Sequence, residues 1–172
     1  MNPLVPFLPV YRASVTAYLG GIALLAVLDF LRLQSSLPGG AMILGLLAIW
    51  FFVLSLHVNR RRHAGRDIAL AFLPVGLAIV GKILGSFISL MPGIYTAMME
   101  FARSNGVDTD DPQALQAALS DPGFQTEFQR QLEANPELVE HIASAAGSGS
   151  FLGFWLVIAG FAIWFARMQK PA

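Results

Sequence analysis

Four long apolar stretches constrain what this chain can fold into. They cover residues 13–33, 41–58, 68–90 and 151–166. About 20 apolar residues in a helix, each adding about 1.5 Å, cross a hydrocarbon core of about 30 Å. The chain is 55% hydrophobic and only 13% charged, whereas soluble domains are about a quarter charged. The sequence therefore predicts an all-α integral membrane protein with four transmembrane helices.

The densest basic run lies in the loop 57–67, between the second and third apolar stretches. It holds four of the eleven Lys and Arg residues: Arg60, Arg61, Arg62 and Arg66. Short Arg-rich loops stay on the cytoplasmic side of a membrane. With four crossings, both termini are then cytoplasmic, and Arg12, Arg167 and Lys170 join the loop on that side.

The first eleven residues, Met1–Tyr11, are apolar and contain Pro3, Pro6 and Pro9 but no basic residue. A secretory signal would place positive charge before its apolar core and small residues at a cleavage site. Prolines at this spacing also prevent a regular helix. We therefore expect this segment to lie at the membrane surface and the first apolar helix to be retained.

The segment 105–149 is acidic. Eight acidic residues between Asp108 and Glu140 face a single basic residue, Arg130. Each of three pairs places a capping residue before a proline: Asp111-Pro112, Asp121-Pro122 and Asn135-Pro136. This pattern starts helices. It predicts short helices over 112–120, 122–134 and 136–146, followed by Gly147–Ser150 as a flexible linker.

These short helices carry apolar stripes on one face. The stripe residues that we expect to touch a partner or the membrane are Phe124, Phe128, Leu132, Leu138 and Ile142. Helices this short bury little surface by themselves, so another helix, lipid or a partner should cover the stripe.

The third apolar helix precedes this acidic segment. Met91–Gly93 should break or kink it, and the pattern of residues 94–103 predicts an amphipathic extension.

Two motifs in this segment, Asp121-Pro122-Gly123-Phe124 and Asn135-Pro136-Glu137-Leu138, resemble the helical repeats of STI1-type chaperone modules. Those modules form an apolar groove for hydrophobic helices, so the resemblance implies the same kind of ligand here. The shared motif is largely helix-capping chemistry, and convergence remains the alternative to kinship.

The run Arg60–Arg66, followed by a Leu-rich helix with Pro74 and Gly76, resembles a family of small bacterial inner-membrane proteins of unknown function. Their signature is an RRLHD-type loop between two spans. The resemblance covers residues 12–90. Ala64 stands where that family has an acid, and its Ser-Gly-Trp-Trp stretch is absent. The resemblance implies a fold and a location in the bacterial inner membrane, and no activity.

The sequence offers little catalytic chemistry. It has no cysteine, and His57 and His63 alone do not supply the three or four converging ligands of a zinc site. Haem would need histidine pairs on facing helices. No supported set of serine, histidine and acid lies on one side. We therefore expect no enzyme, no cofactor, no metal and no nucleic-acid partner.

The remaining candidate sites are glycines for packing between helices and arginines for binding of lipid head groups. Gly20 and Gly21 in the first span, and Gly81 and Gly85 in the third, would let helices approach closely. The sequence leaves open whether the approaching helix belongs to this chain or to a partner. The four loop residues Arg60, Arg61, Arg62 and Arg66 are candidates for anionic lipid head groups, or act only as a topology signal.

Two charged residues lie inside spans, where charge is costly. Asp29 lies 16 residues beyond Ala13, at ~24 Å, and Lys82 lies 14 residues beyond Ile68, at ~21 Å. Their similar depth predicts an intramembrane ion pair between Asp29 and Lys82. In the alternative, Lys82 extends alone to the interface.

The sequence thus predicts three regions: 1–104 with the basic loop, an extracytoplasmic helical cap 105–149, and 150–172 with the fourth span. The function expected is that of a non-enzymatic accessory or assembly subunit that packs against apolar helices of a larger membrane complex. The alternative is a small transporter or ion-conducting protein that uses Lys82 and Asp29. The partners expected are other membrane proteins and lipids, with a homo-oligomer as the alternative to a hetero-complex.

Overall fold

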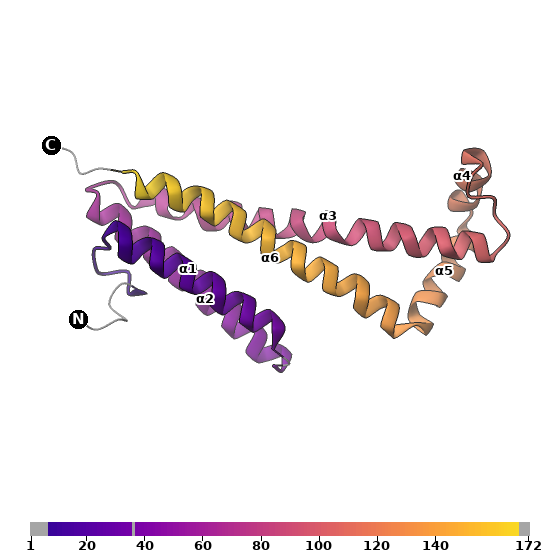
Figure 1. The fold of residues 1–172 in the computed structure, drawn as a ribbon, viewed down its shortest axis with the longest axis horizontal. Coiled ribbons are helices and arrows are strands. Elements are labelled where there is room, and N and C mark those ends of the chain that lie inside the picture. Colours follow the sequence, from indigo (N-terminus) through magenta and orange to yellow (C-terminus); the bar gives the residue numbers. More distant parts are fainter. Residues whose placement is uncertain (1–6, 36, 169–172) are drawn as a thin grey trace. The chain divides into compact units, whose positions relative to one another are not determined.

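The computed structural model describes residues 7–35 and 37–168, all of whose regular elements are helices. The expectations for Pro3, Pro6 and Lys170 lie outside the described residues. The helices are, in order, α1 (Val15–Gln34), α2 (Gly39–His63), the 3-10 helix η2 (Ala69–Ala71), α3 (Leu73–Ser104), α4 (Pro112–Ser120), α5 (Pro122–Ala134) and α6 (Pro136–Ala166) (Figure 1). Four stretches are long and apolar enough to cross a membrane: α1, α2, η2 with α3, and α6. The predicted all-α membrane architecture is confirmed.

The chain packs as two compact units. Unit 1 comprises Met1–Leu84 and Ser150–Ala172, and unit 2 comprises Gly85–Gly149. The three regions expected from the sequence were defined by their location relative to the membrane and not by packing. They stay a prediction.

Unit 1 begins with an antiparallel pair, α1 and α2, joined by a short turn (Figure 1). The Ser14 hydroxyl caps α1 by accepting a hydrogen bond from the Ala17 N–H at 3.3 Å. The helix runs to Gln34, so Arg32 lies in its last turn. At the other end, α2 runs through His63, so most of the basic run is helical rather than a loop.

The core of unit 1 is apolar and rich in aromatic rings. The largest fully buried apolar side chains come from α1, α2 and α6: Tyr18, Val53, Leu56, Phe154, Ile158 and Phe165. Trp50 of α2 stacks on Phe154 of α6, with ring centroids 6.2 Å apart. Many other large apolar side chains point outward. Such a surface is typical of helices that face lipid, because lipid chains are as apolar as the side chains.

The break expected at Met91–Gly93 is wrong, and the kink, its alternative, stays a prediction. Helix α3 is continuous from Leu73 to Ser104, with Pro92 inside it. A proline removes one backbone hydrogen bond, but apolar membrane helices tolerate this loss better than soluble ones. The 32 residues of α3 make a helix of ~48 Å, longer than a hydrocarbon core of about 30 Å.

The flexible linker expected at Gly147–Ser150 is also wrong, because these residues are part of the continuous helix α6. Gly149 lies directly against α3, where a Cβ would collide with the Gly85 carbonyl oxygen and the Ser89 hydroxyl. Close packing between helices uses small residues, and here it outweighs the low helix propensity of glycine.

Unit 2 adds α4 and α5 to parts of α3 and α6. Both short helices have the bounds expected from the sequence. Asp111 Oδ1 accepts a hydrogen bond from the Gln113 N–H, and Asp121 Oδ1 from the Gly123 N–H, each at 2.9 Å. Asn135 instead donates its side-chain amide to the Gln131 carbonyl and closes the end of α5.

Candidate functional site

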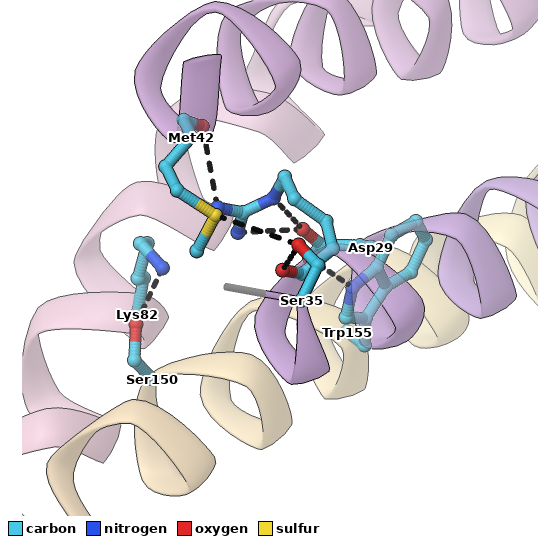
Figure 2. A network of polar contacts seen from close by, with 7 residues as sticks. Asp29, Ser35, Met42, Lys82, Ser150 and Trp155 are labelled. Carbon is cyan, nitrogen blue, oxygen red and sulfur yellow. Dashed lines mark hydrogen bonds and ion pairs between the residues drawn. The ribbon is translucent and has the colours of Figure 1, made fainter. Parts of the chain in front are cut away.

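The most buried carboxylate of unit 1 is Asp29 of α1, which is 3% exposed. Its Oδ1 accepts from Arg32, at 2.8 Å from Nη2 and 2.9 Å from Nε. Its Oδ2 accepts from the indole Nε1–H of Trp155 in α6 at 2.9 Å. Figure 2 shows Asp29 and Trp155 pointing toward each other from their two helices. Both carboxylate oxygens therefore have protein donors.

In the part of the chain that the structure describes, Arg32 is the direct ion-pair partner of Asp29, and the expected pair of Asp29 with Lys82 is limited to a longer-range attraction. Arg32 lies three residues further along the same helix, where side chains are neighbours. Lys82 of α3 donates from Nζ to the Ser150 hydroxyl of α6 at 2.5 Å (Figure 2). It stays within electrostatic reach of Asp29 and Arg32. The estimated depths correctly placed Asp29 and Lys82 in the same region, but they did not identify Arg32 as the ion-pair partner of Asp29.

Arg32 also ties α1 to the start of α2. Its Nη1 donates to the Met42 carbonyl oxygen at 3.3 Å, and the Ser35 hydroxyl donates to the Arg32 carbonyl oxygen at 2.6 Å. We call Asp29, Arg32, Lys82, Ser150 and Trp155 the polar cluster. It lies at the end of unit 1 where α1 turns into α2.

The other end of unit 1 is built around Arg60 in the last turn of α2. Its guanidinium donates to the carbonyl oxygens of Phe165 and Ala166 at 3.0 Å and of Met168 at 2.6 Å. The last carbonyls of a helix lack partners within the helix. Arg60 therefore caps the C-terminus of α6, and its positive charge interacts favourably with the negative end of the helix dipole.

Two neighbouring arginines are also used within the protein. Arg61 donates to the Asp67 carbonyl oxygen, and its guanidinium lies 5.3 Å from the centre of the Phe165 ring. Arg62 is half-buried and donates to the Pro9 carbonyl oxygen. The expectation that Arg60 and Arg61 hold lipid head groups is wrong, since they are only 3% and 4% exposed. Arg66 is exposed and keeps that prediction.

Both ends of the described chain lie near Arg60, at this end of unit 1. The Ala13 N–H donates to the Asn59 carbonyl oxygen at 3.2 Å, and the Asn59 side-chain amide donates to the Leu8 carbonyl oxygen at 2.6 Å. Together with the Arg60 contacts, these bonds place the N-terminal segment, the basic run and the end of α6 together. The cytoplasmic assignment requires this arrangement, and the side of the membrane itself stays a prediction.

A buried pair between α1 and α2 was not anticipated. The Tyr18 hydroxyl lies 2.7 Å from Nδ1 of His57, and both side chains are fully buried. The His57 ring meets the Phe165 ring edge-on, with centroids 5.3 Å apart. Periodicity could mark each residue as inward-facing, but it could not pair them. The described residues contain no group of His, Cys, Asp or Glu able to hold a metal ion.

The glycines predicted for helix packing pack mostly within the chain. A Cβ at Gly81 would lie 2.6 Å from the Gly153 carbonyl oxygen, and Gly85 meets Gly149. Gly21 lies against Leu56 of α2, whereas Gly20 has nothing within 4 Å. For Gly81 and Gly85, the question that the sequence left open is answered in favour of the chain's own α6. The matching spacing Gly149-x-x-x-Gly153 in α6 was the signal for it.

Unit 2 contains a groove between α3, α4 and α5. It has a volume of about 390 Å³, and its apolar lining is Met98, Leu119, Phe124, Phe128 and Leu132. Phe124 and Phe128 rest on the buried Phe101 of α3, at centroid distances of 4.9 and 5.6 Å. Both rings remain only half-buried. The apolar stripe of α5 is thus covered on one side by the protein itself.

The other two stripe residues lie on α6. Leu138 is half-buried, and Ile142 is buried close to Gly93 of α3. The expectation of a partner or membrane contact is therefore wrong for Ile142, which fills the space that the missing side chain of Gly93 leaves.

Comparison with known proteins adds no family to this description. No family model, no curated protein and no solved structure matches the chain.

Proposed function

We propose that this protein is a non-enzymatic accessory or assembly subunit of the bacterial inner membrane. In this proposal the groove of unit 2 holds the apolar face of a helix from a partner membrane protein. The spanning helices anchor the protein in the membrane.

The groove itself carries the proposal. Phe124, Phe128 and Leu132 present a continuous apolar face along α5, and Met98 and Leu119 bound it from α3 and α4. Aromatic and aliphatic side chains in a concave surface are the usual receptors for an amphipathic helix. Gln125 donates to the Leu119 carbonyl oxygen at 2.8 Å and so holds α4 against α5. The groove is therefore built before any ligand arrives.

Charge specifies the kind of helix. Unit 2 carries nine acidic residues against Arg103 and Arg130. Glu127 and Glu133 lie at exposed positions of α5, the helix that supplies most of the groove. Complementary charge guides association and selects partners. A helix with an apolar face and flanking Lys or Arg residues fits this surface best.

The two resemblances of the sequence support the same proposal. The STI1-like starts at Asp121 and Asn135 suggest a module that receives hydrophobic helices. The similarity of residues 12–90 to small bacterial inner-membrane proteins suggests the location. With the basic end of unit 1 in the cytoplasm, residues 105–149 are extracytoplasmic.

The test is retention of membrane proteins by the full chain in mild detergent. Leu132→Gln places an amide in the groove, and Val139→Gln places the same group at an exposed position of α6. We expect the wild type and Val139→Gln to retain the same membrane protein, and Leu132→Gln to lose it. Equal retention by both variants would remove the groove from the proposal.

One observation favours the alternative, a small transporter or ion-conducting protein. Asp29, Arg32 and Lys82 are ionisable groups inside spanning helices, and such groups often mark ion pathways. Ion flux in proteoliposomes that is abolished by Asp29→Asn would favour it. We favour the accessory subunit, because both oxygens of Asp29 are already held by Arg32 and Trp155.

A further inference from the structure

Unit 1 has an open groove between α3 and α6, two of the helices that can span a membrane. We call it the α3–α6 groove. Its volume is about 550 Å³, and its lining is mainly apolar. It runs from Leu77 to Leu84 along α3 and from Trp164 to Leu156 along α6. Gly160 lies in it, and a Cβ added there would meet nothing within 4 Å. The missing side chain of this glycine thus keeps the groove open.

The α3–α6 groove is about as long as one leaflet of a bilayer is deep. Along α6, Trp164 lies two residues before the helix end at Ala166, or ~3 Å, and Leu156 lies ten residues before it, or ~15 Å. Along α3, Leu84 lies 11 residues beyond the helix start at Leu73, or ~16.5 Å. The groove therefore ends about halfway through a hydrocarbon core of about 30 Å.

Direct contact between α3 and α6 closes the inner end of the groove. A Cβ at Gly81 would lie 2.6 Å from the carbonyl oxygen of Gly153, because small residues let the two backbones touch. A helix that packs along a whole span needs a surface of about 30 Å, and this groove offers half of that length. An acyl chain occupies a single leaflet, so its length matches the groove.

Two exposed arginines lie at the outer end of the groove. Arg167 directly follows α6, and Arg66 is close to it in the fold. Their proximity follows from Arg61, whose guanidinium contacts both the Asp67 carbonyl oxygen and the Met168 sulfur. Among the residues that the structure describes, no carboxylate lies at ion-pair distance from Arg66 or Arg167. An anion at this end would therefore meet two available cations.

Trp164 indicates the level of the lipid head groups. Its side chain is 48% exposed and lies at the outer end of the groove. Tryptophans are enriched where a bilayer meets water, because the ring is apolar and its N–H is polar. The apolar groove therefore lies on the acyl-chain side of Trp164, and Arg167 lies on its head-group side.

We propose that the α3–α6 groove binds one anionic phospholipid of the leaflet at the basic end. One acyl chain lies in the groove, and the phosphate lies beside Arg167 and Arg66. A soluble phosphate gains nothing from the apolar lining, and a zwitterionic lipid has no net charge for the arginines to attract. This site is independent of the groove of unit 2.

The test is lipid binding to the purified full chain in detergent, measured by native mass spectrometry. The probes are phosphatidylglycerol, zwitterionic phosphatidylcholine and glycerol phosphate, which has no acyl chain. One cation contributes about a fivefold change in affinity for an anionic lipid surface. We expect Arg167→Met to weaken phosphatidylglycerol binding about fivefold. Arg103→Met removes an equal charge from an exposed position of unit 2 and should preserve the binding.

A second pair of variants tests the groove itself. Gly160→Leu fills the groove with a side chain. Gly20→Leu adds the same side chain to α1, at a position where a Cβ also meets nothing within 4 Å. We expect Gly160→Leu to weaken phosphatidylglycerol binding by at least as much as Arg167→Met, and Gly20→Leu to leave it unchanged.

Four results would overturn the proposal. The first is equal affinity of the wild type for phosphatidylglycerol and phosphatidylcholine, which needs no variant and so does not depend on how well a variant folds. The second is equal phosphatidylglycerol binding by Gly160→Leu and Gly20→Leu. The third is binding of glycerol phosphate as tight as that of phosphatidylglycerol, which would assign the arginines to a soluble phosphate. The fourth is a second copy of the chain, or a partner protein, that the wild type retains and Gly160→Leu loses, which would assign the groove to a helix.

Discussion

Arg60, in the last turn of α2, donates its Nε–H to the carbonyl oxygen of Phe165, in the last turn of α6, at 3.0 Å. This bond joins residues 105 positions apart in the chain. The sequence predicts that Arg60 is part of a topology signal, and the structure shows that Arg60 also caps a helix. The basic run therefore closes one end of unit 1, in addition to the orientation signal that the sequence predicts.

Replacement of Arg60 should destabilise the protein. Arg60→Lys keeps the charge but loses the planar fork that reaches three carbonyl oxygens. A hydrogen bond to a charged group contributes about 1.5–3 kcal/mol, so we expect a loss of about that size. Arg66→Lys, at an exposed position, should leave stability unchanged. Thermal unfolding of both variants in detergent measures the difference, and equal melting temperatures would contradict the capping role.

Charge exchange should identify the partner of Asp29. Asp29→Arg and Arg32→Asp each break the ion pair, and the double variant restores it in reverse, so part of the lost yield of folded protein should return. The exchange of Asp29 with Lys82 should give additive losses. Folding yields of the six variants in one detergent decide the matter. Recovery by the Lys82 exchange alone would reinstate Lys82 as the ion partner.

The glycines of α6 offer a matched pair. Gly149→Ala places a methyl group against the Gly85 carbonyl oxygen and the Ser89 hydroxyl, whereas Gly160→Ala points into open space. Overpacking typically costs about 1–3 kcal/mol, and here the obstacle is partly backbone. We expect Gly149→Ala to lower the melting temperature and Gly160→Ala to leave it equal or higher, since alanine favours helix. Similar effects of both changes would contradict the close contact of α6 with α3.

The sequence predicted much of this fold because local rules determine its elements. Length and hydropathy identified the spans, and Asp111 and Asp121 before prolines marked the starts of α4 and α5. The same rules failed at Pro92 and at Gly147–Ser150. There, residues that break isolated helices lie within apolar helices whose packing maintains them.

The site was harder to predict, because contacts between distant segments leave a weak local signal. Depth along the helices brought Asp29 and Lys82 to the same level. It could not show that Arg32 lies closer or that Trp155 donates to Asp29 from α6. The density of arginines in the basic run suggested exposure to solvent or lipid. In the structure, Arg60 and Arg61 donate to carbonyl oxygens, and Arg61 also contacts the Phe165 ring.

The orientation in the membrane can be tested with single cysteines at exposed positions, because the chain has none of its own. Ser120→Cys in α4 should react with an impermeant thiol reagent in intact cells, and Ala69→Cys beside the basic run should react only after lysis. Ala64 is unsuitable because it is buried. Labelling of Ala69→Cys alone in intact cells would reverse the orientation.

The most direct test of the central claim, that the groove of unit 2 receives a partner helix, is photo-crosslinking in living cells. A photoreactive amino acid at Gln129 lies in the lining of the groove, and one at Gln113 lies outside it on α4. We predict a crosslink from Gln129, but not from Gln113, to one membrane protein, through an apolar helix flanked by Lys or Arg. Crosslinks from Gln129 to lipid alone, or equal crosslinking from both positions, would contradict the account.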